Sequence, residues 1–304
     1  MKVRRIIDAH HHLWDLGADH RYPWLMKQSV VRFFGDPKPI QRDYGVPEFR
    51  EDIGTLPVVA SVHIQVGVES GDELAETLWL QDQQRRHGLP SAIVAFCDLT
   101  APDFEARLDR HRVAESLRGV RQIVGRSADE DRETGSDALL ENPAFEAGLK
   151  RLAELGLSFD LQLIPTQMER AAGLLANVPN LRVALCHGGS LSDFSPQGRA
   201  IWKRGIRLLA ALPNVICKAS GFGMFDKAWS AASVREQFHT MLDAFGPERI
   251  AFGSNFPVEK LATPYVQVWR RYLRMTAGLS GFEQQRLFHD TAVEFYKLSE
   301  TAEP

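Results

Sequence analysis

Short apolar runs recur along the chain, and most of them are followed by a longer segment in which apolar positions recur at helical spacing. The short runs are typical of buried strands, and the longer segments are typical of amphipathic helices. Strands are therefore expected at residues 6–10, 58–66, 91–98, 119–124, 157–164, 181–187, 215–220 and 250–255. Helices are expected at residues 72–88, 101–116, 142–156, 196–212 and 232–246, after residue 166, after residue 263, and from residue 280 to about 298.

Capping residues support several of these helix starts. Asn142 is followed by Pro, which combines a preferred N-cap residue with Pro at the first helical position. Thr166 with Glu169, and Ser280 with Glu283, have the spacing of a capping box. Each of these patterns predicts that a helix begins directly after the capping residue.

The alternation of strands and helices predicts an α/β fold with a parallel sheet. Eight such units in 304 residues favour a closed (β/α)₈ TIM barrel over an open sheet. Residues 1–304 contain no linker or low-complexity stretch, so a single barrel domain is expected. Residues 16–52, after the first strand, form a long connection rich in aromatic side chains. Such a connection is typical of a functional loop or lid, and a surface loop packed by its own aromatics fits equally well.

The charge balance excludes several classes of partner. A net charge of -3 and a sequence pI of about 6.4 provide no basic field for nucleic acid or an anionic membrane, so we expect a small-molecule partner. No apolar run approaches the roughly 18 residues of a membrane span, and the pattern of a signal peptide is lacking, so a cytoplasmic location is expected. The sequence does not predict an oligomeric state. Cys97, Cys186 and Cys217 lie in apolar runs and are expected to be buried and unpaired.

A cluster of histidines ends the first predicted strand. Side chains two residues apart on a strand share a face, so Asp8, His10 and His12 are expected on one face and His11 on the other. Two imidazoles about 6 to 7 Å apart on one face can reach the same metal ion or the same substrate. A His-rich turn after an edge strand would give the same local sequence, so the other strands must distinguish the two interpretations.

Polar side chains lie at or near the ends of the other predicted strands as well. They are His63 and Gln65, Asp98, Arg121, Asp160 and Gln162, His187, Lys218, and Asn255. In a (β/α)₈ barrel the C-terminal ends of all strands open at one mouth, so these side chains are expected to converge. Convergence of this kind favours a catalytic function for the histidine cluster.

Several of these residues have a structural alternative. His187 precedes a Gly-Gly turn at the open end of a strand, which favours a functional role over a barrel-core role. Lys218 would be costly inside the barrel without an anion, so it is expected to contact substrate or an ion-pair partner. Arg121 fits a loop clamp as well as a substrate contact, and His63 fits the barrel core as well as the site. The candidate substrate-binding residues are Arg121, Lys218, Gln65, His63 and Trp14.

Several motifs, in chain order, resemble the amidohydrolase superfamily. They are Asp8 to Asp15 (DAHHHLWD), Tyr22-Pro23-Trp24-Leu25, Trp79-Leu80-Gln81, Gly119-Val120-Arg121, Cys186-His187-Gly188-Gly189, Pro213 to Gly221 (PNVICKASG) and Phe252 to Pro257 (FGSNFP). Together they are similar to the branch that contains sugar-acid lactonases and 2-pyrone-4,6-dicarboxylate hydrolase, over nearly the whole chain. The resemblance implies a (β/α)₈ barrel and attack of water on an ester or lactone carbonyl.

The resemblance also implies roles for individual residues. His10 and His12 correspond to the first-strand histidines, His187 to the sixth-strand histidine, and Arg121 to a substrate-holding arginine. Asn255 stands where the family usually has an aspartate that activates water and often touches a metal ion. A neutral amide cannot accept a proton at pH 7, so Asn255 can orient water or offer its carbonyl oxygen but cannot be the base. His187 is the expected base in its place.

The same departure affects the expected metal site. The candidate ligands His10, His12 and His187 are short of anionic partners, because the last-strand aspartate and a fifth-strand histidine are both missing. Three histidines and a water can still hold a divalent ion such as zinc or manganese. The sequence therefore allows catalysis with a divalent metal ion or without one, and no organic cofactor is expected.

The sequence therefore predicts a hydrolase that opens a lactone derived from a sugar acid or from aromatic degradation. The expected catalytic residues are His10, His12, His187 and Asn255, with the first two, or an ion that they hold, stabilising the oxyanion. One alternative is a metal-dependent decarboxylase of the same superfamily. Another is a small-molecule binding protein that lost catalysis together with the last-strand aspartate.

Overall fold

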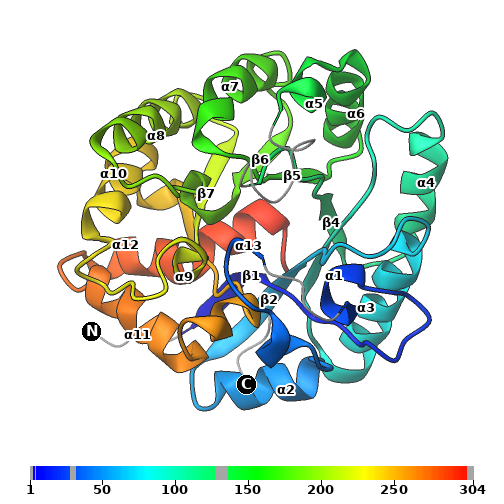
Figure 1. Cartoon of the computed structure of the whole chain (residues 1–304), viewed down its shortest axis with the longest axis horizontal. Helices are drawn as coiled ribbons and strands as arrows, with labels where there is room; N and C mark the ends of the chain where they lie inside the picture. Colours follow the sequence, from blue (N-terminus) through cyan, green and yellow to red (C-terminus); the bar gives the residue numbers. More distant parts are fainter. Residues whose placement is uncertain (1–2, 4, 28–31, 127–135, 300–304) are drawn as a thin grey trace.

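Eight parallel strands form the centre of the computed structural model, which describes residues 3, 5–27, 32–126 and 136–299 (Figure 1). They are β1 (Ile6–His11), β2 (Val58–Ile64), β3 (Ala92–Ala95), β4 (Leu117–Val120), β5 (Ser158–Leu161), β6 (Arg182–Leu185), β7 (Val215–Ala219) and β8 (Ile250–Phe252). Each strand pairs with the next one in the sequence. Beyond β8, the N–H of Asn255 donates to the carbonyl of His10, and the N–H of His12 donates to the carbonyl of Phe256, both at 2.7 Å. These bonds join β8 to β1, and the predicted (β/α)₈ barrel is confirmed.

Helices surround the barrel and follow most of its strands (Figure 1). They are α1 (Pro23–Met26), α2 (Val46–Ile53), α3 (Glu73–His87), α4 (Phe104–His111), α5 (Ala138–Glu141), α6 (Pro143–Glu154), α7 (Met168–Ala176), α8 (Pro196–Ala210), α9 (Phe222–Phe225), α10 (Arg235–Phe245), α11 (Tyr265–Met275), α12 (Gly281–Gln285) and α13 (Thr291–Tyr296). The predicted caps at Asn142 and Ser280 are confirmed. The predicted capping box at Thr166 is wrong, because a 3₁₀ turn precedes α7 and the side chain of Gln167 accepts from the N–H of Ile164.

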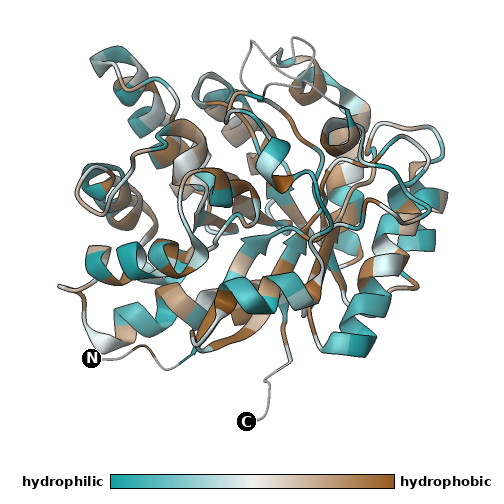
Figure 2. Cartoon of the chain, turned by 60° about the horizontal axis from the view of Figure 1, so that its bottom comes forward, coloured by the Kyte–Doolittle hydropathy of each residue, from teal (hydrophilic) through white to brown (hydrophobic). Residues whose placement is uncertain are grey.

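Side chains of the strands and of the last helix pack together inside the barrel, and this helix closes its N-terminal end. The inner cluster includes Ala9, Ala60, Ala92, Ala184 and Ala251 from the strands and Ala292, Phe295 and Tyr296 from α13. Figure 2 shows hydrophobic residues concentrated on the central strands and hydrophilic residues on the surrounding helices. The hydroxyl of Tyr296 lies 3.0 and 3.1 Å from the two carboxylate oxygens of Asp160, inside the barrel. The opposite end, at the C-terminal ends of the strands, is therefore the open one.

Strict alternation along β1 predicted Asp8 on the face of His10 and His12, and this prediction is wrong. The pairing of β1 with β2 shifts register after Asp8. The Asp8 carboxylate accepts hydrogen bonds from the N–H of Ser254 at 2.8 Å and from the hydroxyl of Tyr265, on α11 outside the barrel, at 3.0 Å. The register shift separates Asp8 from the two histidines, which turn toward the mouth.

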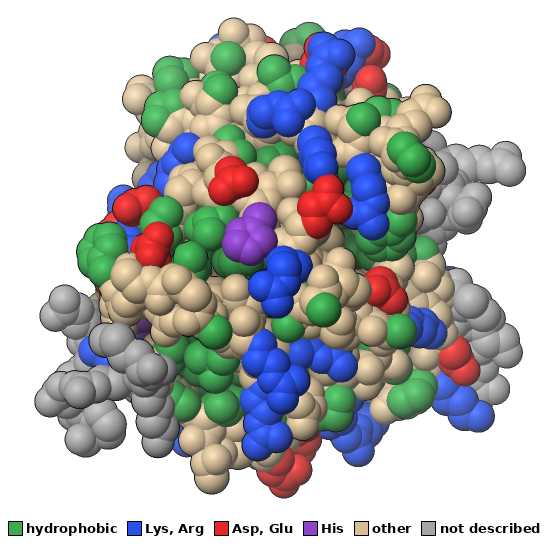
Figure 3. Space-filling model, turned by 90° about the vertical axis from the view of Figure 1, so that its left-hand side faces the viewer, with side chains coloured by type: hydrophobic (Ala, Val, Ile, Leu, Met, Phe, Trp, Pro, Cys, Tyr) green, Lys and Arg blue, Asp and Glu red, His purple; other side chains and the backbone are tan. Residues whose placement is uncertain are grey.

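Basic and acidic side chains are mixed on the side of the molecule that carries α8 and α10 (Figure 3). Lys203 on α8, for example, pairs with Glu236 on α10 at 2.6 Å. The mixture agrees with the small net charge, because it leaves no large field of one sign on this face. Within the described part of the chain, none of the helices combines the length and apolar character that crossing a membrane requires.

Candidate active site

Three imidazoles meet at the C-terminal mouth of the barrel. The ring centroid of His10 lies 4.5 Å from that of His187 and 5.2 Å from that of His12. His10 and His12 lie at the end of β1, whereas His187 follows β6, and all three side chains are buried. The structure thus brings together the three histidines that the sequence singled out.

His12 is held by one ring nitrogen and faces Asn255 with the other. Nδ1 lies 2.7 Å from the carbonyl oxygen of Ile64, which can only accept, so Nδ1 carries the proton and donates. In the neutral ring Nε2 is then an acceptor, and it lies 3.3 Å from the side-chain amide of Asn255. Turning the NH₂ group of that amide toward Nε2 satisfies both groups and pairs an amide nitrogen that otherwise has no partner. The lone pair of His12 is thereby used within the site.

A left-handed turn presents His187 to the mouth. His187, Gly188 and Gly189 have φ values of 54°, 56° and 75°. Nδ1 of His187 lies 3.0 Å from the hydroxyl of Ser220, directly after β7. A Cβ atom at Gly221 would lie 2.6 Å from this Nδ1, so the ring can approach the turn only because the residue is glycine. With Nδ1 held in this way, Nε2 is the ring nitrogen left to meet a ligand.

Burial keeps the three imidazoles neutral. Desolvation, followed by the positive charges of Arg121 and Lys218, lowers the pKa of His187 well below 6.5. Desolvation, followed by Arg121, lowers the pKa of His12 to about 3. The pKa of His10 is also lowered, by desolvation first and by Lys218 second. At pH 7 the three rings therefore offer lone pairs and no charge.

Arg121 brings a buried positive charge to the same mouth. Nη1 donates to Oε1 of Gln162 at 2.8 Å, and Nη2 donates to the backbone carbonyl of Gln65. The acceptors in both bonds are neutral, and Nε has no hydrogen-bond partner among the described residues. Burial lowers the pKa of Arg121 below its ordinary value. A desolvated guanidinium with neutral partners is suited to hold a negatively charged group of a ligand.

These groups line a pocket whose empty space, about 510 Å³, includes its opening to solvent. Its polar wall is formed by His12, Arg32, Arg121, Arg126, Gln162, His187 and Asn255, and its apolar wall by Trp24, Phe33, Phe34, Val66, Ile123, Met224 and Val258. Among the described lining residues there is no Asp or Glu. Part of the wall comes from the long connection 16–52, of which residues 28–31 lie outside the described part. The indole N–H of Trp24 donates to the carbonyl of Val66 at 2.9 Å and fixes this connection beside the mouth.

Trp14, His63, Gln65 and Lys218 were predicted to bind substrate but do not line this pocket. The indole N–H of Trp14 donates to the carbonyl of Arg42 at 2.7 Å and fastens the long connection. Nδ1 of His63 accepts a hydrogen bond at 3.1 Å from a backbone N–H that follows β1. Gln65 contributes its backbone carbonyl to Arg121. Trp14, His63 and Gln65 thus contact the segments and side chains that form the site rather than the pocket itself.

Three residues that position the site received no role from the sequence. They are Ser220, which orients His187, Gly221, which makes room for its ring, and Trp24, which forms part of the wall. All three lie within the motifs at residues 22–25 and 213–221, so the motifs were the available signal. Their individual roles depend on contacts between segments that are distant in the sequence.

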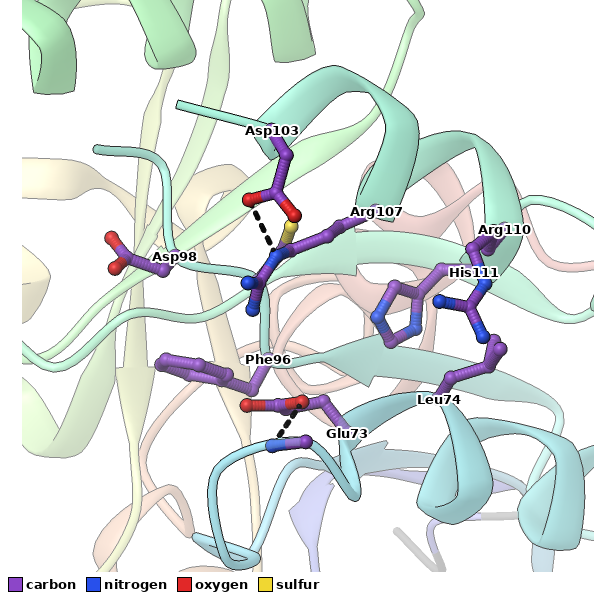
Figure 4. Close-up of a pocket in the computed structure, with 10 residues that line it drawn as sticks. Glu73, Leu74, Phe96, Asp98, Asp103, Arg107, Arg110 and His111 are labelled. Carbon is purple, nitrogen blue, oxygen red and sulfur yellow. Dashed lines mark hydrogen bonds and ion pairs between the residues drawn. The ribbon is translucent and has the colours of Figure 1, made fainter. Parts of the chain in front are cut away.

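A second hollow lies between α3 and α4, and none of His10, His12 and His187 lines it (Figure 4). Several of its charged side chains are engaged with one another or with neighbouring groups. Arg107 donates to Asp103 at 2.7 Å, and Glu73 accepts from the N–H of Gly71 at 2.9 Å. Among the described residues that line it, no buried polar side-chain atom lacks a partner. We therefore assign the candidate active site to the barrel mouth.

One group of possible metal ligands exists among the residues that the structure describes. Ligand atoms of His10, Asp160 and Cys186 all lie within 4.8 Å of one another, and both ring nitrogens of His10 lack a hydrogen-bond partner. The predicted ligand set of His10, His12 and His187 does not form such a group in the part of the chain that the structure describes. However, Oδ2 of Asp160 contacts Nζ of Lys218, and both side chains are fully buried. Because two cations compete for one carboxylate, this arrangement does not fit a resident divalent ion.

The comparisons with known sequences agree with this geometry. Residues 7–298 match the amidohydrolase family. An uncharacterized protein of Sinorhizobium fredii is 37% identical over 96% of this chain and 98% of its own length. An L-fucono-1,5-lactonase of Burkholderia multivorans is 29% identical over 98% of this chain and 97% of its own length.

Solved structures superpose over nearly the whole chain. An amidohydrolase of Burkholderia multivorans with bound zinc has a TM-score of 0.79 at 28% identity, over 97% of this chain and 99% of that chain. A 5-carboxyvanillate decarboxylase of Sphingomonas paucimobilis has a TM-score of 0.63 at 14% identity, over 98% of this chain and 100% of that chain, which shows the fold alone. Because the family match spans almost every residue of the barrel, the chain belongs to the amidohydrolase family.

Proposed function

We propose that this protein is a lactonase, which hydrolyses a cyclic ester to a hydroxy acid. The observation that carries the proposal is the pocket itself, where a neutral His187 with an available Nε2 stands beside the guanidinium of Arg121 and the amide of Asn255. These are a base and two hydrogen-bond donors, which is what attack of water on a carbonyl requires. The similarity to an L-fucono-1,5-lactonase over nearly the full length supports the same reaction class.

His187 is the proposed base, because the lone pair of His12 already accepts from Asn255 and His10 lies behind the pocket wall. Water attacks the carbonyl carbon as its proton moves to Nε2 of His187, and the carbonyl oxygen becomes an oxyanion. When the intermediate collapses, the ring C–O bond breaks and the leaving oxygen takes the proton from the imidazolium. Atoms and charge balance without a redox partner, and the base is regenerated.

Arg121 is the proposed anchor for negative charge. Its buried guanidinium keeps Nε without a partner among the described residues, and its other donors point to neutral oxygens. A carboxylate of the substrate or the developing oxyanion would complete its coordination. The apolar wall, with Trp24 and Phe34, would hold the remaining face of the ring.

The alternative of a metal-dependent decarboxylase requires a tightly held ion, and the pairing of Asp160 with Lys218 argues against one. Metal analysis after dialysis tests this alternative. A stoichiometric ion, together with loss of activity in a chelator, would favour the decarboxylase, whereas we expect full lactone turnover in the presence of chelator.

The alternative of a non-catalytic binding protein depends on Asn255 as a mark of lost catalysis. The test is a panel of sugar-acid and aromatic-derived lactones, assayed with the native chain and with Asn255→Asp. We expect the native chain to turn over at least one lactone. Turnover by Asn255→Asp alone would reject the lactonase proposal and support the binding protein.

A further inference from the structure

The floor of the site contains a buried ion pair that the proposed reaction does not use. Nζ of Lys218, on β7, contacts Oδ2 of Asp160, on β5, and lies 3.4 Å from the carbonyl oxygen of Ala9. The hydroxyl of Tyr296, on α13, lies 3.0 Å from the same carboxylate oxygen. Both charged side chains have no exposed surface. A single ammonium thus neutralises a carboxylate that is shielded from water on every side.

The same carboxylate oxygen belongs to a set of metal donors. Sγ of Cys186 lies 4.0 Å from Oδ2 of Asp160, and a ring nitrogen of His10 completes the group within 4.8 Å. In a tetrahedral site with bonds of about 2.1 Å, ligand atoms lie about 3.4 Å apart, so the distances within the group need to shorten by up to about 1.4 Å. Both ring nitrogens of His10 lack a hydrogen-bond partner, so the imidazole is free to bind. A thiolate, an imidazole and a carboxylate, with a fourth position open, form a donor set that suits zinc or cobalt.

The ammonium and a divalent ion exclude each other at this position. An ion bound to Oδ2 of Asp160 would stand within a few ångströms of Nζ of Lys218, since both would contact the same oxygen. Repulsion between the two charges is weakly screened in a dry interior, and the barrel floor offers no second carboxylate among its described residues to compensate for it. The lysine therefore fills the cation position with a charge that the chain itself supplies.

We propose that His10, Asp160 and Cys186 form a latent binding site for zinc or cobalt, and that the ammonium of Lys218 occupies its cation position in the native protein. Native protein binds no ion there. Removal of the ammonium leaves the Asp160 carboxylate without its counter-charge, and a divalent ion then takes its place. The thiol proton of Cys186 is released to solvent on binding, so the affinity of the site rises with pH.

Titration with Co²⁺ tests the proposal, because a cobalt-bound thiolate gives a sulfur-to-metal absorption band that imidazole and carboxylate ligands alone do not. The native chain is compared with Lys218→Met, which removes the ammonium and keeps most of the side-chain volume. Lys203→Met is the matched control, because that ammonium lies on the surface and pairs with Glu236. We expect about one equivalent of Co²⁺ and the thiolate band in Lys218→Met, and neither in the native chain or in the control.

Two further variants assign the ligands. In the Lys218→Met background, Cys186→Ser should abolish the thiolate band, and Asp160→Asn should abolish stoichiometric binding. Zn²⁺ should raise the melting temperature of Lys218→Met and leave that of the native chain unchanged, because an ion that binds only the folded state stabilises it.

Several results would overturn the proposal. A thiolate band in the native chain would show that the ammonium does not exclude the ion. A folded Lys218→Met that binds no Co²⁺, or binds it without dependence on Cys186, would show that the donors do not form a site. If Lys218→Met and the smaller Lys218→Ala both fail to fold with or without Zn²⁺, the ion cannot replace the ammonium and the proposal is rejected.

Discussion

Replacement of His187 by asparagine is the most direct test of the proposed chemistry. The asparagine retains a side chain that can hydrogen bond to Ser220 but cannot accept a proton from water at pH 7. General-base catalysis contributes about a hundredfold to ten-thousandfold in rate. We therefore expect kcat of His187→Asn to fall at least about a hundredfold, which corresponds to about 2.7 kcal/mol of transition-state stabilisation.

Ser220→Ala is the matched comparison, because it removes only the hydrogen bond that orients the ring. The lost bond is 3.0 Å long and buried, and such a bond is worth about 0.5–1.5 kcal/mol. That range corresponds to a loss of about twofold to tenfold in kcat. The two variants should therefore differ by at least about tenfold on the same lactone, with little change in KM for either.

The pH profile provides a second readout. Burial and the positive charges of Arg121 and Lys218 hold the pKa of His187 well below 6.5. A base acts only when it is unprotonated, so kcat/KM for the native chain should stay constant from pH 8 down past 6.5 and fall at lower pH. His187→Asn should lose this acid limb.

If His187→Asn hydrolyses a lactone with the same kcat as the native chain, His187 is not the base. An acid limb at or above pH 6.5 would refute the assigned environment of the ring. If kcat falls by the same factor in Ser220→Ala and His187→Asn, the effect arises from the orientation of the ring rather than from proton transfer.

Three further perturbations follow from buried polar groups. Arg121→Met should raise the pKa of His187 toward 6.5, because Arg121 is among the charges that lower it. The same variant should raise KM for the lactone at least tenfold, because the anchor for negative charge is lost. An acid limb at the same pH as in the native chain would contradict the first of these effects. Tyr296→Phe should lower the free energy of unfolding by about 1.5–3 kcal/mol, because its hydroxyl bonds the charged Asp160, and urea denaturation showing a loss below about 0.5 kcal/mol would reject the estimate. Burial raises the pKa of Glu259 to about 8 from 4.5, so the folded state holds its proton over this range and the unfolded state does not. Native stability relative to Glu259→Gln should then decrease as pH rises from 5 to 8, by up to about 1.4 kcal/mol per pH unit, and parallel curves in urea denaturation at several pH values would refute it.

The position of the site could be predicted from the sequence, whereas the role of each residue could not. Polar residues at the ends of eight predicted strands were expected to converge once the barrel closed. His10 and His187 do so, whereas Asp98 lines the second hollow. The sequence allowed Lys218 either a substrate or an ion-pair partner, and the structure pairs it with Asp160 inside the barrel. A lysine near the end of a strand fits a substrate contact and a buried ion pair equally well, so only its neighbours across the barrel distinguish the two roles.

The order of strands and helices was determined by the sequence itself, because periodicity and caps such as Asn142 and Ser280 depend on residues a few positions apart. Asp8 shows the limit of such patterns, since a register shift between two strands breaks the alternation that predicted its face. Tertiary structure alone decided which nitrogen of His187 is free and which cation neutralises Asp160. The physical reason is that hydrogen bonding and charge pairing in a dry interior depend on distances between segments that the chain brings together only by folding.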